Sequence, residues 1–425
     1  MTGTLITVGQ ARACVLRNTP RLPPEPVHLL EALDRVLAQD LLASGDVPAF
    51  SCAAMDGYAV RAGPSGRRMT VIGESRAGAP ARERLGEGKA LAGDGEALGD
   101  GEALREGEPL GEGEAIRIST GAVVPVGATA VIRQEDVDGR AASIDTRATI
   151  MPSENIRQAG EDLRAGATVL RAGIVLGAAE LGAAVAAGAA RVLAARRPRV
   201  AILCTGDELR APGERLGRGE IHNSNAPMLV TLVTRCGGVA APAERLPDQQ
   251  VATESALTAA LARSDVVILS GGVSGGPHDH VKDALAAIGV GELFWGVALQ
   301  PGKPTWFGAR DEKLVFGLPG NPVSAVVAFL LFARPALAAL QGAVPDRTVG
   351  AQARLGVEVA RRPSREQALC VRLEDHEAVT VAFPNRPQGS HRVSSLLGAH
   401  ALALIPPGEG ELAAGSLVAL VTLPR

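Results

Sequence analysis

The stretch DVVILSGGVSGGPHDHVKDAL, residues 265–285, decides the fold, because it reads as a buried strand, a glycine-rich turn and an amphipathic helix in succession. Two further stretches follow the same order, RVAILCTGDEL at residues 199–209 and LVFGLPGNPVSAVVAFLL at residues 314–331. Repeated strand, loop and helix units predict the α/β class, with a doubly wound parallel sheet covered by helices. We therefore expect TGDEL, SGGVSGG and GLPGNP to meet at the carboxyl edge of that sheet.

The segments around this α/β region follow other patterns. Apolar residues at helical spacing, Val27 among them, predict helix over residues 1–45, and the Ala-rich run within residues 155–195 predicts about four to five helical turns. Short strands between Gly and Pro are expected over residues 46–150. From about residue 345, apolar segments spaced by turns predict a small β-barrel or sandwich.

A short repeat occupies residues 86–116, with the copies GEGKAL, GDGEAL twice, REGEPL and GEGEAI. A β-helix is disfavoured, because about 30 residues would not complete two coils or bury a core of their own. Tracts rich in Gly and Glu do not offset their ordering entropy. We therefore interpret the repeat as a duplicated, solvated surface loop without a binding role.

The composition excludes several classes of function. The 425 residues include 43 Lys+Arg and 46 Asp+Glu, and a formal net charge of −3 offers no general attraction for nucleic acid or an anionic membrane. Aromatic residues make up 2%, too few for a base-stacking surface. Five cysteines without a C-x-x-C pair predict reduced thiols, and MTGTLITVGQ lacks the features of a secretory signal. We expect a cytoplasmic protein with no nucleic-acid or membrane partner.

The loop SGGVSGG, residues 270–276, leaves backbone N–H groups uncovered at the start of a helix, which favours an anion such as phosphate. Gly271, Gly272 and Ser274 are therefore candidate substrate-binding residues. The loop matches neither G-x-x-x-x-G-K-[ST] nor a clean G-x-G-x-x-G, so a P-loop NTPase and an ordinary dinucleotide-binding fold are disfavoured. Routine βα architecture remains the alternative.

The turn GLPGNP, residues 317–322, offers a second set of candidates. Asn321 and Pro322 suit the N-cap and first position of the apolar helix that follows, so helix initiation alone is an equal alternative. Convergence with the other two loops favours substrate binding. The candidates in this turn are Pro319, Gly320, Asn321 and Pro322.

Carboxylates and lysines near the same edge suggest further chemistry. Asp207 and Glu208 directly follow a buried strand, and Asp279 lies in the neighbouring loop. Such carboxylates suit a hard cation like Mg²⁺ that bridges to phosphate oxygens, with helix capping as the alternative. Only four of the 43 basic residues are lysine, and the lysines kept in DHVKD and PGKP, Lys282 and Lys303, indicate a need for a compact positive charge.

The motifs become specific through their order along nearly the whole chain: AAMDGYAVR, RISTGAVVP, AGEDLRAG, AAELGAAVAAG, CTGDEL, SGGVSGGPHDHVKDAL, PGKP, GLPGNPVSA and QGSHRVSSL. In this order they resemble the MoeA family, which comprises the molybdopterin molybdenumtransferases and the gephyrin E domain. By itself, the segment with MDGYA at residues 50–62 predicts only a turn with a buried tyrosine.

The resemblance implies an elongated homodimer of four-part subunits. The parts would be a helical dimerisation domain at residues 1–45 and 151–195, a strand-rich lid domain at 46–150, a MogA-like α/β molybdopterin-binding domain at 196–343, and a C-terminal β-barrel at 344–425. It also implies a site between the α/β domain of one subunit and the lid of the other.

The resemblance further implies a reaction and its residues. Molybdate would be inserted into the dithiolene of adenylylated molybdopterin with metal-dependent release of AMP, with Mg²⁺ as the expected cation and a MogA-type adenylyltransferase acting upstream. By position, the family's functional residues fall on Asp56, Thr120, Asp162, Glu180 and Asp207 as catalytic groups, on Glu208 and Asp279 as metal ligands, and on Pro319, Pro322 and Ser390 as substrate-binding residues.

One departure from the family pattern leaves alternatives open. Several members carry two lysines before PGKP, where this chain has Gly296 and Gln300, and Arg157, Arg164 or Arg392 are candidates to supply the lost charge. The departure motivates an alternative function, a molybdopterin-binding carrier or chaperone that keeps the fold without catalysis. A MogA-type adenylyltransferase is a third hypothesis, but it leaves the MDGYA and β-barrel regions unexplained. A gephyrin-like scaffolding role has no support in the sequence.

Overall fold

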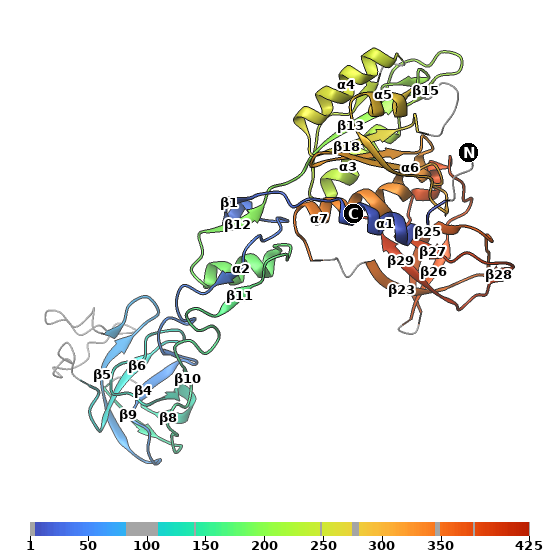
Figure 1. Ribbon diagram of the computed structural model, residues 1–425. Helices are drawn as coiled ribbons and strands as arrows, with labels where there is room; N and C mark the ends of the chain where they lie inside the picture. Colours follow the sequence, from blue (N-terminus) through green and yellow to red (C-terminus); the bar gives the residue numbers. More distant parts are fainter. Residues whose placement is uncertain are drawn as a thin grey trace. The chain divides into compact units, whose positions relative to one another are not determined.

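The computed structural model divides into two compact units, which are described separately (Figure 1). Unit 1 consists of Met1–Gln39, Arg171–Ala178 and Arg191–Arg425, and unit 2 consists of Asp40–Leu170 and Ala179–Ala190. The division into four domains stays a prediction. The structure describes residues 5–81, 109–139, 142–246, 249–273, 280–344, 349–376 and 379–424.

A seven-stranded sheet forms the α/β part of unit 1. Its strands follow the order β16-β13-β18-β22-β21-β19, and β17 also pairs with β13. The central strands β13, β18 and β22 are parallel, whereas β21 and β19 are antiparallel. The strands are β13 Arg199–Thr205, β16 Val239–Ala240, β17 Glu244–Leu246, β18 Val266–Ser270, β19 Gly291–Trp295, β21 Trp306–Arg310 and β22 Lys313–Leu318.

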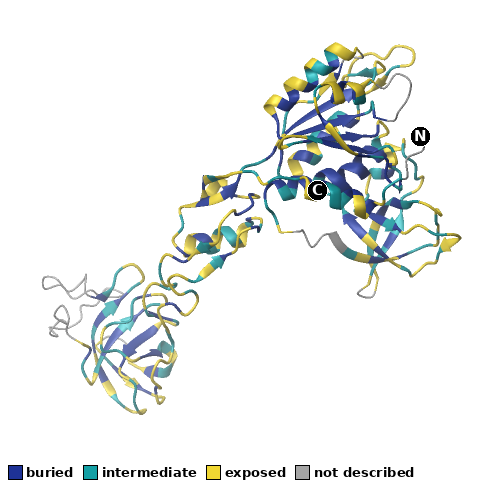
Figure 2. Ribbon diagram, in the orientation of Figure 1, coloured by how far each residue is buried: buried dark blue, intermediate teal, exposed yellow. Residues whose placement is uncertain are grey.

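Helices cover both faces of this sheet, so the predicted doubly wound arrangement is confirmed. Ile202 and Cys204 of β13 pack with residues of α1, α3, α6 and α7, while Ala201 and Leu203 pack with residues of α4 and α5. Successive strand residues point to opposite faces, which buries β13 on both sides. Figure 2 shows the buried strands and the exposed outer faces of the helices. The helices are α1 Val8–Arg17, α3 Asn225–Arg235, α4 Gln250–Arg263, α5 Val281–Ala287, α6 Pro322–Ala328 and α7 Arg334–Leu340.

One helical run is long and apolar enough to cross a membrane by length and composition alone. It extends over 19 residues, Pro322–Leu340, with a mean hydropathy of 2.1, and joins α6 to α7 through a π-helical turn at Phe329–Ala333. The run is nevertheless a core element, because 78% of its most apolar window is buried inside the protein. Burial against the sheet accounts for its apolar composition.

The three predicted loops leave the sheet from neighbouring positions. Cys204 of β13 pairs with Ser270 of β18, and Ser270 pairs with Leu318 of β22, so the strands end at the same level. The expected convergence of TGDEL, SGGVSGG and GLPGNP is therefore confirmed for the described residues. Residues 274–279 of the second loop, which include Ser274 and Asp279, lie outside them.

The C-terminal strands of unit 1 close into a barrel, one of the two forms expected. Around the ring, β25 pairs with β26, β26 with β23, β23 with β29, β29 with β27, and β27 again with β25. A short strand from the α/β part, β20 at Leu299–Gln300, joins the barrel by pairing with β25. The barrel strands are β23 Val349–Leu355, β25 Glu366–His376, β26 Val379–Pro384, β27 Ala401–Ile405 and β29 Leu417–Thr422.

The helical prediction for residues 1–45 is wrong beyond α1. Val27 lies on strand β1, Pro24–His28, which pairs antiparallel with β12, Arg191–Ala195. Proline lacks an amide hydrogen and disfavours helix at the preceding residue, so the chain is extended here. The responsible residues are Pro23, Pro24 and Pro26.

The Ala-rich run forms a shorter helix than predicted. Helix α2 covers Ala178–Ala186, and the chain turns at Gly188, where φ is +87° and a Cβ would collide with Ser44 Oγ. Residues 191–195 then pair with β1 instead of continuing the helix. Strand pairing therefore overrides the helix propensity of alanine.

Unit 2 contains a six-stranded sheet in the order β7-β4-β6-β5-β9-β8. The strands expected in YAVRA, MTVIGE, AIRIS and ATAVIRQ are present as β4, β5, β6 and β7. Tyr58 is 2% exposed in the core, as the turn with a buried tyrosine predicts. The strands are β4 Gly57–Val60, β5 Arg68–Ser75, β6 Glu114–Ile118, β7 Ala130–Arg133, β8 Val137–Asp138 and β9 Ser143–Thr146; the paired short strands are β2 Leu41–Leu42 with β11 Thr168–Leu170, and β3 Cys52–Ala53 with β10 Ile156–Arg157.

The end of the hexad repeat is not a solvated surface loop. Leu110 is 1% exposed, and Ala115 and Ile116, which belong to β6, are fully buried. Strand β6 pairs with β4 on one side and β5 on the other, so the last copy of the repeat is a central part of the sheet. Residues 82–108, which hold most of the other copies, lie outside the described residues.

Candidate functional site

Two glycines after β18 bring the backbone close to the end of β13. Gly271 and Gly272 have φ angles of +90° and +69°, a region that favours glycine. A Cβ on Gly271 would lie 2.6 Å from Thr205 Oγ1, and one on Gly272 would lie 2.5 Å from Val281 Cγ2. Both positions therefore require glycine. The end of β13 is approached here by backbone atoms and not by a side chain of the glycine pair.

The turn after β22 connects this glycine pair to the barrel. The Gly271 N–H donates to the Leu318 carbonyl at 3.0 Å. Asn321 occupies the predicted N-cap position of α6, with proline at the first helical position, but its side chain makes no capping hydrogen bond. Asn321 Nδ2 donates instead to Ser390 Oγ at 3.2 Å, and the Val323 N–H donates to the Ser390 carbonyl at 3.1 Å. The side chain that would cap the helix is thus used to hold a barrel loop.

A cleft of about 510 Å³ opens where the α/β part meets the barrel within unit 1. Arg362 and Arg365 from the barrel line it. Together with the lysine of PGKP they place three basic side chains around one cleft, which favours an anionic ligand. Predicted substrate-binding residues that line the cleft are Lys303, Pro319, Gly320, Asn321 and Ser390.

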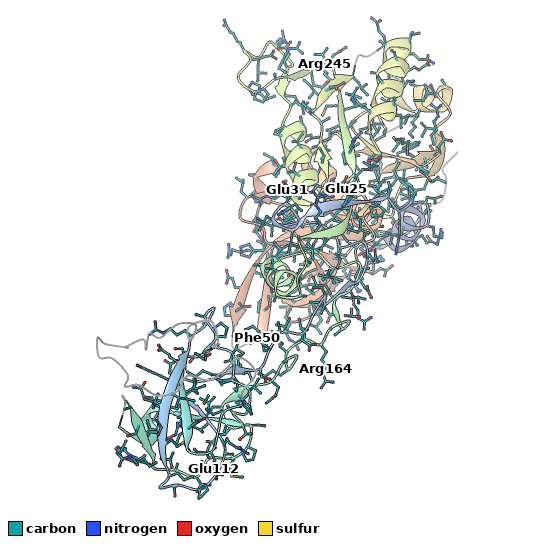
Figure 3. The ribbon with its side chains drawn as sticks, turned by 90° about the vertical axis from the view of Figure 1, so that its left-hand side faces the viewer. Glu25, Glu31, Phe50, Glu112, Arg164 and Arg245 are labelled. Carbon is teal, nitrogen blue, oxygen red and sulfur yellow. The ribbon has the colours of Figure 1, made fainter. Side chains whose placement is uncertain are left out.

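The two cleft arginines and Gln367 were not predicted from the sequence. Gln367 is 8% exposed, and its Oε1 has no hydrogen-bond partner in the described part of the chain. Gln367 pairs with Gln300 across β25 and β20, and Gln300 lines the same cleft as Arg362 and Arg365. The sequence feature that could have indicated these arginines is the basic run RRPSRE at residues 361–366. Arg164, one of the arginines considered for this role, is exposed in unit 2 (Figure 3).

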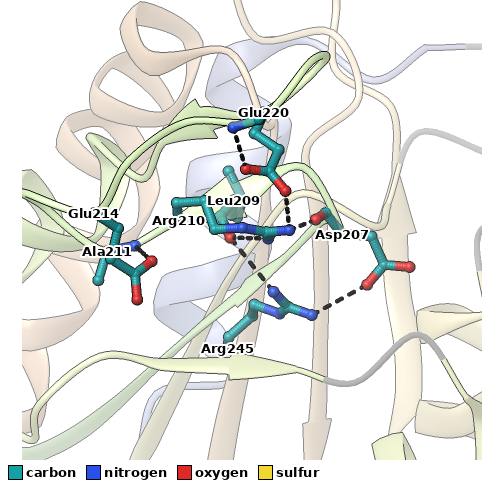
Figure 4. Close-up of polar contacts among 8 residues, drawn as sticks. Asp207, Leu209, Arg210, Ala211, Glu214, Glu220 and Arg245 are labelled. Carbon is teal, nitrogen blue, oxygen red and sulfur yellow. Dashed lines mark hydrogen bonds and ion pairs between the residues drawn. The ribbon is translucent and has the colours of Figure 1, made fainter.

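Asp207 and Glu208 follow β13 in a turn that arginine side chains hold (Figure 4). Arg245 Nη2 donates to Asp207 Oδ1 at 3.3 Å, and Arg210 Nη1 donates to the Asp207 carbonyl at 2.9 Å. Arg210 also forms an ion pair with Glu220, whose pKa is lowered first by a backbone hydrogen bond and then by this arginine. The Asp207 side chain remains 69% exposed, and Glu208 is exposed beside it.

The predicted metal site is incomplete among the described residues. No group of three or more His, Cys, Asp or Glu side chains in this part of the chain could hold a metal ion. Asp207 is paired with Arg245, and Asp279, the third predicted donor, lies outside the described residues. Asp207 and Glu208 are therefore the two described members of the predicted donor set.

Lys282 is held near the glycine-rich loop by a contact with the ring of Trp295. Its Nζ is 4.1 Å from the centroid of the Trp295 ring, a favourable position for a cation. Trp295 Nε1 donates to the Val273 carbonyl at 2.9 Å, which fixes the indole against the loop. The contact keeps a positive charge next to the last described residue of SGGVSGG.

In unit 2 the structure brings Asp56 and Thr120 together. Asp56 immediately precedes β4 and Thr120 follows β6, and these strands pair with Gly57 opposite Ile118. Asp56 Oδ1 accepts hydrogen bonds from the Thr120 N–H at 2.7 Å and from Thr120 Oγ1 at 2.8 Å. These two bonds, the backbone one first, hold the pKa of Asp56 below its usual value. The two hydrogen bonds therefore stabilise the ionised form of the Asp56 carboxyl.

The remaining catalytic candidates of unit 2 lie on other segments. Asp162 is exposed in the loop between β10 and β11. Glu180 is half-buried in the first turn of α2. Neither residue belongs to the two strand ends that hold Asp56 and Thr120.

Three separate regions of the chain match known family models, two of which describe MoeA proteins. Residues 6–188 match the MoeA N-terminal region (domain I and II), residues 201–339 match a probable molybdopterin binding domain, and residues 352–423 match the MoeA C-terminal region (domain IV). A molybdopterin molybdenumtransferase of Haemophilus influenzae is 33% identical over 98% of both chains. The chain belongs to the MoeA family.

Further MoeA proteins are similar over comparable lengths. Molybdopterin molybdenumtransferase 2 of Mycobacterium tuberculosis is 35% identical, over 92% of this chain and 93% of that protein. The crystal structure of a molybdopterin biosynthesis MoeA protein from Pyrococcus horikoshii superposes with a TM-score of 0.77 at 30% identity, over 99% of both chains. The family and the fold class predicted from the sequence are both confirmed.

The candidate residues fall within these three matched regions. The cleft takes Lys303 and Asn321 from the probable molybdopterin binding domain, and Arg362, Arg365 and Ser390 from the MoeA C-terminal region. The four candidates of unit 2 fall within the MoeA N-terminal region. The basic cleft is therefore assembled from two of the three matched regions.

Proposed function

We propose that this MoeA-family chain is a molybdopterin molybdenumtransferase, which inserts molybdate into adenylylated molybdopterin and releases AMP. The observation that carries the proposal is the basic cleft, built between a molybdopterin binding domain and the MoeA C-terminal region. Relatives that are 33% and 35% identical over most of their length bear the name of this transferase. Nothing in these comparisons favours the impaired carrier.

The chemistry of the cleft suits a tetrahedral dianion such as molybdate. Lys303 offers a compact ammonium group, and Arg362 and Arg365 offer planar guanidinium groups that donate two hydrogen bonds at once. The Ser390 hydroxyl, held by Asn321, adds a neutral donor. Three positive charges gathered in one cleft attract an anion locally although the whole chain carries a net charge of −3, so molybdate does not need a basic protein.

The neighbouring loops suit the phosphates of the adenylylated substrate. Gly271 and Gly272 keep the strand ends free of side chains, and Gly320 does the same in the next loop. Lys282, held over Trp295, supplies a positive charge beside them. We assign substrate binding to these residues and to the remaining predicted members of both loops: Ser274, Pro319 and Pro322.

In unit 2 we propose Asp56, Thr120, Asp162 and Glu180 as catalytic residues. Thr120 gives both of its hydrogens to Asp56 Oδ1, and this leaves Oδ2 of a charged carboxylate to accept a hydrogen from the substrate or from water. Asp207, at the end of β13, is the corresponding carboxylate of unit 1, and Arg245 orients it. Each carboxylate is thus held by a neighbour of its own unit.

Mg²⁺ belongs to the proposal through the chemistry of its predicted donors. Asp207, Glu208 and Asp279 would hold it, and the ion would neutralise phosphate charge during release of AMP. The described residues do not complete the predicted set of three donors, because Asp279 lies outside them. No other step depends on the ion.

We further propose a cytoplasmic homodimer that receives its substrate from a MogA-type adenylyltransferase. Large apolar side chains are exposed around the β1–β12 ribbon of unit 1, where Val175 pairs with Val36 and Ala194 with Leu37. An exposed cluster of this kind favours burial against another subunit. The exposed side chains are Leu30 (81%), Leu33 (50%), Val175 (53%) and Leu193 (38%).

A turnover assay tests the function. The purified chain is incubated with adenylylated molybdopterin, molybdate and Mg²⁺, and AMP and Mo-molybdopterin are quantified separately. We expect both products in equal amounts. A chain that binds the substrate but retains AMP and forms no Mo-molybdopterin is a carrier, and ATP-dependent adenylylation of molybdopterin would identify an adenylyltransferase.

A further inference from the structure

One buried amide connects the two substrate loops of unit 1. Asn225 begins helix α3 and is 8% exposed. Its Nδ2 donates to Ser270 Oγ at 2.8 Å and to the Gly320 carbonyl at 2.7 Å. Ser270 ends β18 directly before the glycine pair, and Gly320 lies in the turn after β22. The side chain therefore bridges both loops from below the edge of the sheet.

The orientation of this amide is determined by its partners. A backbone carbonyl only accepts hydrogen bonds, so the atom that faces Gly320 has to be the NH₂ group. Asn225 Oδ1 consequently points away from both loops, where it is buried without a hydrogen-bond partner in the described part of the chain. Burying an unpaired carbonyl is unfavourable, so the arrangement is retained at a cost in stability.

The bridge acts where the loops already approach each other closely. The Gly271 N–H donates to the Leu318 carbonyl, and a Cβ on Gly320 would lie only 3.8 Å from the Gly271 Cα. Without the amide, the carbonyl of Gly320 would lose a buried donor, and the turn would be free to move away from β18. The spacing between the two loops thus depends on this backbone contact and on one side chain that is remote in sequence from both loops.

We infer that Asn225 is a positioning residue, which holds the loops at the spacing that binds the phosphate groups of adenylylated molybdopterin. It acts through Ser270 and Gly320 rather than by contact with the reacting atoms. The inference rests on the proposed function for the identity of the substrate. It goes beyond that function because it names the group that sets the width of the phosphate site.

Asn225→Asp tests the inference with almost no change in volume. A carboxylate has no hydrogen to donate, so its oxygen would face the Gly320 carbonyl with repulsion in place of a hydrogen bond. We expect the dissociation constant for adenylylated molybdopterin, measured by equilibrium binding, to rise at least about tenfold. Native-state hydrogen exchange should accelerate at residues 270–273 and 317–321.

Gln341→Glu is the matched control. Gln341 is also a buried amide, 6% exposed, with an unpartnered Oε1, and its Nε2 donates to the Leu337 carbonyl at 3.0 Å at the end of α7. We expect this variant to lose stability while binding adenylylated molybdopterin as the wild-type chain does. An equal loss of binding in both variants would reduce the effect of Asn225 to general destabilisation and overturn the inference.

Asn225→Ala keeps the test decisive if the aspartate variant does not fold. It removes both hydrogen bonds without adding repulsion, so binding should weaken by a smaller factor; unchanged binding in this variant would also overturn the inference. The proposed function is judged separately, by turnover of the wild-type chain. A wild-type chain without turnover would contradict the function, whereas the ratio of binding constants still decides the role of Asn225.

Discussion

The basic cleft of unit 1 and the Asp56–Thr120 pair of unit 2 hold their polar groups by different means. The loops beside the cleft depend on positive-φ glycines and on a buried side chain from another helix. Asp56 depends on the backbone and hydroxyl of one residue at the end of the neighbouring strand. A substitution in the buried arrangement should lower binding or stability over the whole pH range, whereas one in the exposed pair should shift the pKa of one carboxyl and change stability only in step with that shift.

The largest effect should follow Asp207→Asn, which removes the carboxylate at the end of β13. Loss of one electrostatic group at a reacting centre slows reactions by roughly 10²–10³-fold, and we expect about 100-fold slower AMP release. Single-turnover measurement with adenylylated molybdopterin checks this. Asp311→Asn, in an exposed side chain at the opposite end of β22, should have no effect. Unchanged turnover in the Asp207 variant would exclude this residue from catalysis.

Lys303→Met should affect molybdate more than the adenylylated substrate. Hydrogen bonds to a charged group contribute about 1.5–3 kcal/mol, so the KM for molybdate should rise by roughly 10–100-fold. Lys313→Met is the matched control, because Lys313 Nζ donates to the Ser264 carbonyl at 2.8 Å at the other end of the strands. Equal changes in the KM for molybdate in the two variants would mean that molybdate does not bind in the cleft.

Gly271→Ala should destabilise unit 1 in a way that its neighbour Gly320→Ala does not. Alanine at a φ of +90° is strained by about 1–2 kcal/mol, and its Cβ would also collide with Thr205 Oγ1. The nearest atom to a Cβ on Gly320 is 3.8 Å away, which is ordinary contact, so about 0.5 kcal/mol or less is expected there. Urea denaturation measures both. Equal stabilities would mean that the glycine pair is not required by geometry.

Much of unit 1 was predictable because its signals are local. A buried strand, a glycine-rich turn and a helix repeat three times, and parallel pairing then brings Asp207, Gly271 and Asn321 to one edge. The N-terminal region was mispredicted because β1 and β12 are about 165 residues apart and neither strand is recognisable without its partner. The end of the repeat was mispredicted because the last copy gains a core only by pairing between β4 and β5.

Apart from the residues that the family motifs and the strand ends indicate, the candidate site was predictable where function needs an unusual backbone or a rare residue type. Gly271, Gly272 and Lys303 stand out in a sequence for these reasons. Arg362 and Arg365 do not, because arginine is the common basic residue of this chain and only closure of the barrel brings them to the cleft. Asn225 is equally inconspicuous, since its partners lie 45 and 95 residues further along the chain.

The smallest effect should follow Thr120→Val in unit 2, which removes one of two donors to Asp56. The pKa of Asp56 should rise but stay below its usual value, because the backbone N–H, the larger cause, remains. The folded-state pKa is lowered, so the pair stabilises unit 2 above the unfolded pKa of aspartate and loses this contribution as pH falls through the folded value. The stability difference between wild type and variant should therefore vanish in acid. NMR titration of the Asp56 carboxyl checks the shift, with Thr70→Val, an exposed threonine of the same sheet, as control. An unchanged titration would mean that the hydroxyl contributes nothing, and the backbone of β6 alone would hold the carboxylate.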